Sequence, residues 1–117
     1  MTTQISAVLA SEHTRTLIIR SGIGTYTLTV GELGITIVRE ALGERGLVGS
    51  AISDAGSVKL RVDIRKWAFE DPISVYREIC NVIDTACDGN VHGFTDTQTS
   101  ALSHLCAAII TRMSETS

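Results

Sequence analysis

The residues best suited to chemistry in this sequence lie in one alternating stretch, Ser57 to Trp67. Every second position there is charged, and these positions are Lys59, Arg61, Asp63 and Arg65. Side chains two apart in a β-strand share one face and lie about 6.6–7 Å apart along it. Phosphates along a nucleic-acid strand are spaced comparably, so the pattern predicts a row of cations that each bind a phosphate. Asp63 interrupts the row and should lower the affinity, which suits a binder that must also release.

The intervening residues of this stretch must position the charged ones. They are apolar and mostly β-branched: Val58, Leu60, Val62 and Ile64. A period of two with this composition predicts a strand that covers a core with one face and presents its charges on the other. We expect it to be the central strand of a sheet. A solvated sheet surface is the alternative interpretation of the charged face.

Three other polar residues extend the predicted RNA-binding surface if their segments are strands. Arg39 and Arg77 add cations, and Asn81 offers an amide donor and acceptor to base edges. Residues 31–46 carry a helix-like stripe, but the β-branched run Ile35–Val38 favours a strand over Gly34 to Leu42. Residues 73–86 favour a helix, with Asp71 as its N-cap and Pro72 at its first position.

The other segments are easier to assign. Gln4–Ala10 is a candidate edge strand, and a polar turn at Ser11–His13 follows it. Thr14–Arg20 and Thr25–Val30 form a hairpin around the turn Ser21–Gly24. The glycine- and serine-rich residues 43–56 are expected to be a loop. Thr95–Gln98 has the form of a capping box, and an apolar stripe predicts a helix after it, with Leu102, Leu105, Cys106, Ile109 and Met113.

The composition sets limits on the class of protein. The chain has 117 residues, 44% of them hydrophobic and 20% charged, with a formal net charge of −3. We expect one domain over residues 1–117, without a membrane span or a signal peptide. The three cysteines form no C-x-x-C pair, so neither a disulfide scaffold nor a zinc site is expected. Because no catalytic or phosphate-loop motif is present, we expect neither an enzyme nor a cofactor.

At this length, short antiparallel strands with glycine turns followed by an amphipathic helix resemble the coat proteins of single-stranded RNA bacteriophages of the levivirus type. Four features carry the likeness. Lys59–Ile64 looks like the family's central strand, and Thr14–Leu17 looks like its N-terminal hairpin. Arg77 and Asn81 match the arginine and asparagine of its last strand, although the helical spacing of residues 73–86 departs from that strand. Thr95–Asp96 and the stripe that follows look like its C-terminal helix.

The resemblance implies an α+β fold, with an antiparallel sheet of about five to six strands followed by a C-terminal helix. It implies an interlocked homodimer in which helices of the partner cover the outer face of the sheet. Such dimers build an icosahedral shell, a virion or virus-like particle, in the bacterial cytoplasm. The inner sheet face then binds the RNA genome or a hairpin within it.

A second interpretation of the same sequence is a small intracellular protein-interaction module. Its elements would follow the order β-β-α-β-α-α, as in an immunity or adaptor protein. The two interpretations differ most in the size of the assembled particle.

Overall fold

The computed structural model describes residues 4–10, 14–54 and 57–116, so the turn expected at Ser11–His13 lies outside the described residues. Six strands come first: β1 (Gln4–Ala10), β2 (Arg15–Ser21), β3 (Gly24–Val30), β4 (Gly34–Ala41), β5 (Glu44–Asp54) and β6 (Ser57–Val62). Two helices follow, α1 (Pro72–Cys87) and α2 (Asp96–Thr116). Short 3-10 turns lie at Arg65–Trp67 and Asp88–Asn90.

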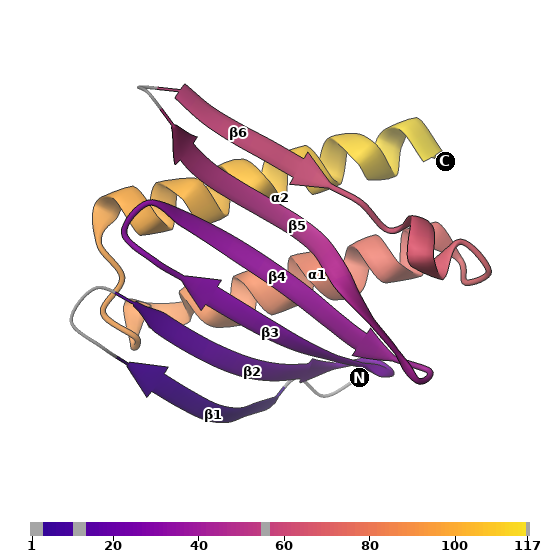
Figure 1. Ribbon diagram of the computed structural model, residues 1–117, viewed down its shortest axis with the longest axis horizontal. Coiled ribbons are helices and arrows are strands. Elements are labelled where there is room, and N and C mark those ends of the chain that lie inside the picture. Colours follow the sequence, from indigo (N-terminus) through magenta and orange to yellow (C-terminus); the bar gives the residue numbers. More distant parts are fainter. Residues whose placement is uncertain (1–3, 11–13, 55–56, 117) are drawn as a thin grey trace.

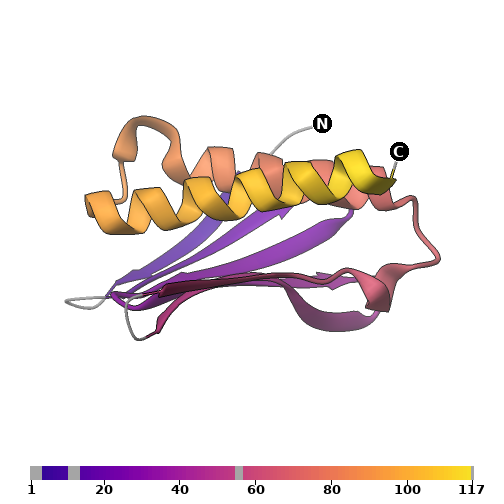
Figure 2. The same ribbon diagram turned by 90° about the horizontal axis from the view of Figure 1, so that it is seen from above.

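The strands form one antiparallel sheet in which each strand pairs with its neighbours in sequence, in the order β1-β2-β3-β4-β5-β6 (Figure 1). Both helices lie across the same face of this sheet (Figure 2). The α+β fold with a C-terminal helix is therefore confirmed, as are the β2–β3 hairpin and the strand at β4. The order β-β-α-β-α-α is not found.

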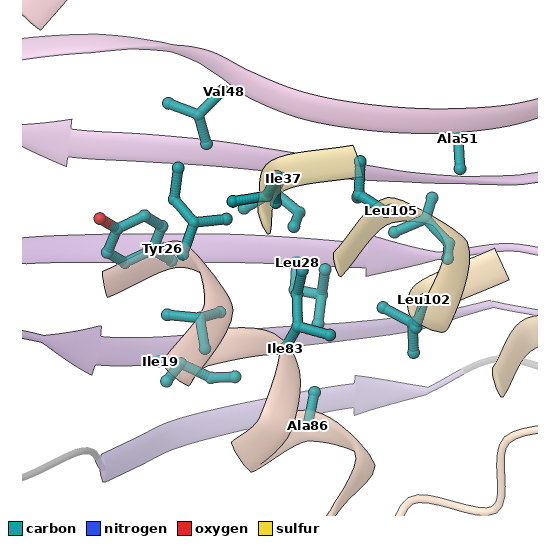
Figure 3. Packing of buried hydrophobic residues seen from close by; sticks show 14 of the residues in the cluster. Ile19, Tyr26, Leu28, Ile37, Val48, Ala51, Ile83, Ala86, Leu102 and Leu105 are labelled. Carbon is teal, nitrogen blue, oxygen red and sulfur yellow. The ribbon is translucent and has the colours of Figure 1, made fainter. Parts of the chain in front are cut away.

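The core lies between the sheet and the two helices. Alternation along β2, β3 and β4 places apolar side chains on the helix side, where they are at most 1% exposed: Leu17, Ile19, Tyr26, Leu28, Val30, Ile35 and Ile37. They pack against one face of α1 and the predicted stripe of α2 (Figure 3). Each such side chain contributes about 1.5–3 kcal/mol before entropy. The chain's own helices thus provide the cover that the resemblance assigns to a partner.

Both helices begin at the caps that the sequence predicts. Asp71 accepts a hydrogen bond from the Ile73 backbone N–H at 3.3 Å, and Pro72 occupies the first position of α1. At α2, the Thr95 N–H donates to Gln98 Oε1 at 2.9 Å and the Gln98 N–H donates to Thr95 Oγ1 at 3.1 Å. These reciprocal bonds are a capping box. The helix assigned to residues 73–86 from local signals is confirmed.

The prediction of a loop over residues 43–56 is wrong, because most of this segment is strand β5. It pairs with β4 on one side and β6 on the other. The glycines of this segment made the strand hard to recognise from the sequence, because glycine inside a strand usually weakens it. Such a glycine often marks a place where another part of the chain approaches the backbone closely. A Cβ atom at Gly46 would lie 3.0 Å from the Lys66 side chain and 3.4 Å from the Trp67 ring, so this glycine allows a close approach. At Gly49 a Cβ atom would meet the Leu105 methyl groups of α2 at an ordinary contact distance of 3.5 Å.

The central position expected for the stretch from Ser57 is also wrong. Strand β6 ends at Val62 and forms an edge of the sheet. Its apolar side chains point to the helix side, yet Val58 remains 53% exposed and Leu60 44% exposed. An edge strand has a neighbour on one side only, so alternation alone does not bury its apolar face. Ile64, beyond the strand end, does reach the core.

Candidate nucleic-acid interface

Within the described ranges, one face of the sheet carries no helix, and we call it the open face (Figure 2). The strand register assigns the side chains on it, because residues paired across antiparallel strands point to the same side. They are Thr16, Ile18 and Arg20; Thr25, Thr27 and Thr29; Thr36, Val38 and Glu40; Arg45, Leu47, Ser50 and Ile52; and Lys59 and Arg61. Hydroxyl groups and cations therefore dominate this face.

Four hydroxyl-bearing residues form a row across the open face and end at a guanidinium. Thr16 pairs with Thr29, Thr29 with Thr36, Thr36 with Ser50, and Ser50 with Arg61. Neighbouring strands lie about 4.8 Å apart, so the row crosses the sheet with closely spaced donors and acceptors. Ser50 is only 5% exposed, so the three threonines supply the accessible hydroxyls of the row. A hydroxyl both donates and accepts, which suits contacts to phosphate, ribose and base edges alike.

The end of this row opens into a depression of about 500 Å³ on the open face. Its lining includes Thr36, Ser50, Ile52, Lys59 and Arg61. Ile52 is 45% exposed and gives the depression an apolar wall beside its cations. This combination can hold a base against an apolar side chain and a phosphate against a positive charge. The structure therefore brings the predicted pair Lys59 and Arg61 together, with hydroxyl groups that were not predicted to belong to the site.

The other two charged residues of the predicted row lie just past the end of β6. Asp63 Oδ1 accepts hydrogen bonds from the Arg65 backbone N–H at 3.0 Å and from Arg65 Nε at 3.1 Å. Asp63 Oδ2 accepts from Arg65 Nη2 at 3.0 Å and from Arg61 Nη2 at 3.4 Å. The hydrogen bonds from Arg65 hold the pKa of Asp63 well below its usual range, so this carboxylate stays charged. Asp63 therefore binds Arg61 and Arg65, and does more than interrupt the predicted row of cations.

Arg39 was expected to extend the patch, and this prediction is wrong. Its side chain lies on the helix side of β4 and is fully buried. It donates to both oxygens of Glu70, at 2.5 and 3.1 Å, to Glu78 at 3.1 Å and to the Tyr26 hydroxyl at 3.0 Å. Its guanidinium also lies 5.1 Å from the centre of the Trp67 ring. We call these five residues the buried charge cluster.

The buried charge cluster contains two carboxylates and one guanidinium, so its charges are only partly balanced. Burial raises the pKa of Glu78 above its usual range, against the attraction of Arg39. Burial by itself lowers the pKa of Arg39, but the hydrogen bond to Glu70 and the nearby charges raise it overall, so Arg39 stays protonated. Burial also raises the pKa of Tyr26. This cluster joins β4 to α1 and the segment before it, and it has no contact with the open face.

Arg77 and Asn81 are also misplaced by the strand interpretation, because they lie on α1. They line a cleft of about 700 Å³ between α1 and the β2–β3 turn, together with Glu70 and Glu78. Asn81 Nδ2 donates to the Ser21 hydroxyl at 3.0 Å across this cleft. The cleft lies on the helix side of the sheet, so neither residue joins Lys59 and Arg61.

The threonines of the open face and the cations Arg20 and Arg45 were not among the predicted site residues. A signal for the threonines was present, since Thr25, Thr27 and Thr29 alternate with apolar residues along one strand. Arg45 was hidden in the segment expected to be a loop. It lies 4.0 Å from Glu40 on the same face, an exposed pair.

Comparisons with known proteins found no relative of this chain. No protein-family model, no curated protein and no solved structure matches the chain. Across the ranges 4–10, 14–54 and 57–116, no helix is long and apolar enough to cross a membrane. Among these same residues, no three His, Cys, Asp or Glu side chains gather closely enough to hold a metal ion.

Proposed function

We propose that this chain is a coat protein that assembles into a shell and binds RNA on the open face of its sheet. One observation carries the proposal: both helices lie on one side of the sheet, and the other side presents a row of hydroxyls that ends at Arg61. An uncovered sheet face lined by hydroxyls and cations can contact a single strand along its backbone and its bases. Because the whole chain carries a net charge of −3, this local arrangement must supply the attraction.

Self-association is the second part of the proposal, and strand β6 supports it. In the described sheet, β6 pairs on one side only and carries the exposed apolar residues Val58 and Leu60. Backbone groups at such an edge, beside apolar side chains, favour pairing with another chain. A second copy is the natural partner in a shell, and the resulting homodimer would be its building block.

Leu60→Lys tests this association. The side chain is already 44% exposed, so the variant should fold, but a charge at the strand edge opposes pairing. We expect the parent to elute as large particles and the variant as a monomer in size-exclusion chromatography. Ile110→Lys is the matched control, because Ile110 is similarly exposed, at 48%, but belongs to α2 and offers no strand backbone for pairing. A parent that stays monomeric, with no particles in electron micrographs, would favour the protein-interaction module instead.

RNA binding is tested by Lys59→Ala and Arg61→Ala. Each should weaken binding to single-stranded RNA across sequences and reduce the slope of log affinity against log salt by roughly 0.7. Arg77→Ala is the control, since Arg77 is exposed on the helix side of the sheet and should leave the slope unchanged. An unchanged slope in the double variant of Lys59 and Arg61 would mean that this face is a solvated surface.

A further inference from the structure

A further hollow lies at the end of β6, where Arg61 and Arg65 meet Arg112 from a distant part of the sequence. This cleft of about 520 Å³ is lined by Arg61, Arg65 and Arg112, with Asp63 and the buried Tyr76. Arg112 comes from the last turns of α2, so the fold, and not the alternation along β6, brings it here. The sequence analysis gave Arg112 no role.

The guanidiniums in this cleft are held in place by a carboxylate. Arg65 uses Nε and Nη2 to bind Asp63, and Arg61 uses Nη2. A guanidinium has five N–H groups, so donors on the other edge of each arginine are not used in these bonds. Fixing the side chains in advance lowers the entropy that a ligand must overcome. Asp63 is therefore suited to the role of a positioning residue for the two arginines.

The charge around the cleft is positive in an otherwise acidic protein. Arg112 lies 3.7 Å from Glu115. Among the residues that the structure describes, the cleft and this pair bring together three guanidiniums and two carboxylates, those of Asp63 and Glu115. The three arginine side chains are 57–87% exposed, so an anion can reach them without a rearrangement of the core. Forked guanidinium donors match the oxygen pairs of a phosphate group.

We propose that this cleft is a phosphate subsite, and that it receives one phosphate of an RNA strand that leaves the open face at the end of β6. This proposal rests on the proposed RNA-binding function. Arg61 connects the two places, because it lines both the depression on the open face and the cleft. An RNA strand that contacts Lys59 and Arg61 can then continue past Asp63 to Arg65 and Arg112.

Inorganic pyrophosphate is the probe for the cleft itself, because its binding does not depend on RNA recognition. In an NMR titration, we expect it to shift the arginine Nε signals of Arg61, Arg65 and Arg112. Arg112→Ala should weaken its binding roughly two- to fivefold, as expected for an exposed ion pair. Arg77→Ala is the control and should leave it unchanged. Equal binding by the parent and the Arg112 variant would overturn the subsite.

Asp63→Asn separates positioning from simple charge. If Asp63 only repels anions, the variant binds pyrophosphate more tightly than the parent does. If Asp63 holds Arg61 and Arg65 in place, the variant binds more weakly although it has lost a negative charge. We expect the weaker binding, and tighter binding would overturn the positioning role.

RNA measurements then distinguish the failure of this subsite from that of the proposed function. Arg112→Ala should reduce the salt slope for single-stranded RNA by roughly 0.7, as for one phosphate contact. Loss of pyrophosphate binding with an unchanged RNA slope would overturn RNA as the source of the phosphate. If the parent binds pyrophosphate in the cleft but no RNA, the proposed function fails and the anion site stands. If it binds RNA on the open face but no pyrophosphate, the subsite fails.

Discussion

The buried charge cluster and the end of β6 contain the same chemical unit, an arginine bound through two nitrogens to a carboxylate. They differ in their access to water. The Arg39 side chain is fully buried and that of its partner Glu70 is 14% exposed. The Arg65 side chain is 87% exposed, and that of its partner Asp63 is 20% exposed. One sequence thus places equivalent pairs in two very different dielectric surroundings.

This difference determines what each pair can do. In the core, removing one partner leaves a charge that water cannot solvate, so breaking the pair should destabilise the fold strongly although the net contribution of the intact pair is small. At the surface, water screens the charges, and the pair contributes little to stability. Arg65 retains N–H donors that a ligand can reach, whereas the donors of Arg39 form hydrogen bonds with Glu70, Glu78 and Tyr26. Burial, and not residue type, separates a structural arginine from a binding one.

The largest expected effect comes from Arg39→Met, which removes the only guanidinium of the buried charge cluster. Glu70 and Glu78 then remain near each other without a cation, and the free energy of unfolding should fall by about 3–5 kcal/mol. Urea denaturation followed by Trp67 fluorescence measures it. Arg61→Met is the matched control on the open face and should change the unfolding midpoint little.

A triple variant sharpens this result. Arg39→Met combined with Glu70→Gln and Glu78→Gln removes the uncompensated charges together with the guanidinium. It should regain part of the stability lost by the single variant, because neutral amides cost less to bury than carboxylates. If the single variant is as stable as the parent, the comparison between the two regions breaks down.

Much of the fold could be predicted from the sequence, because local signals and tertiary packing agree there. The hairpin of β2 and β3 has clean alternation and a glycine turn, and both helices have caps that the structure contains. Strand β5 could not be predicted, since Gly46 and Gly49 weaken its pattern. For Gly46, the explanation is the close approach of Lys66 and Trp67, which lie about twenty residues further along the chain and meet it only in the fold.

The candidate site was harder to predict, because charge alone does not reveal the face on which a residue lies. Arg39 lies two residues after Ile37 and four after Ile35, so it shares their face of β4, and this spacing placed it on the core side once β4 was assigned as a strand. Lys59 and Arg61 were assigned to the correct face, but the position of β6 at the edge depends on β5. Arg112 joins the end of β6 only through the packing of α2, which no local pattern shows.

A smaller effect is expected from pH, through Glu78. Its pKa is raised by burial above the ordinary value of 4.5, so the folded protein holds the proton more tightly than the unfolded chain. The stability that this adds is complete below pH 4.5 and is lost as pH rises through the raised pKa. The stability of the parent relative to Glu78→Gln should therefore fall from about pH 4 towards neutrality. Denaturation curves at several pH values test this, and a difference that grows with pH would contradict it.

The smallest expected effect on stability is that of Arg65→Ala. Arg65 lowers the pKa of Asp63, so its contribution is present above the ordinary Asp63 value of 3.8 and is lost as pH falls through the lowered value. Because the Arg65 side chain is largely in water, screening should make the change at pH 7 too small to measure in urea denaturation. The same variant should weaken pyrophosphate binding, since the cleft loses one of its three guanidiniums. An unfolding midpoint well below that of the parent would show that this exposed pair stabilises the fold, and the contrast with Arg39 would then be wrong.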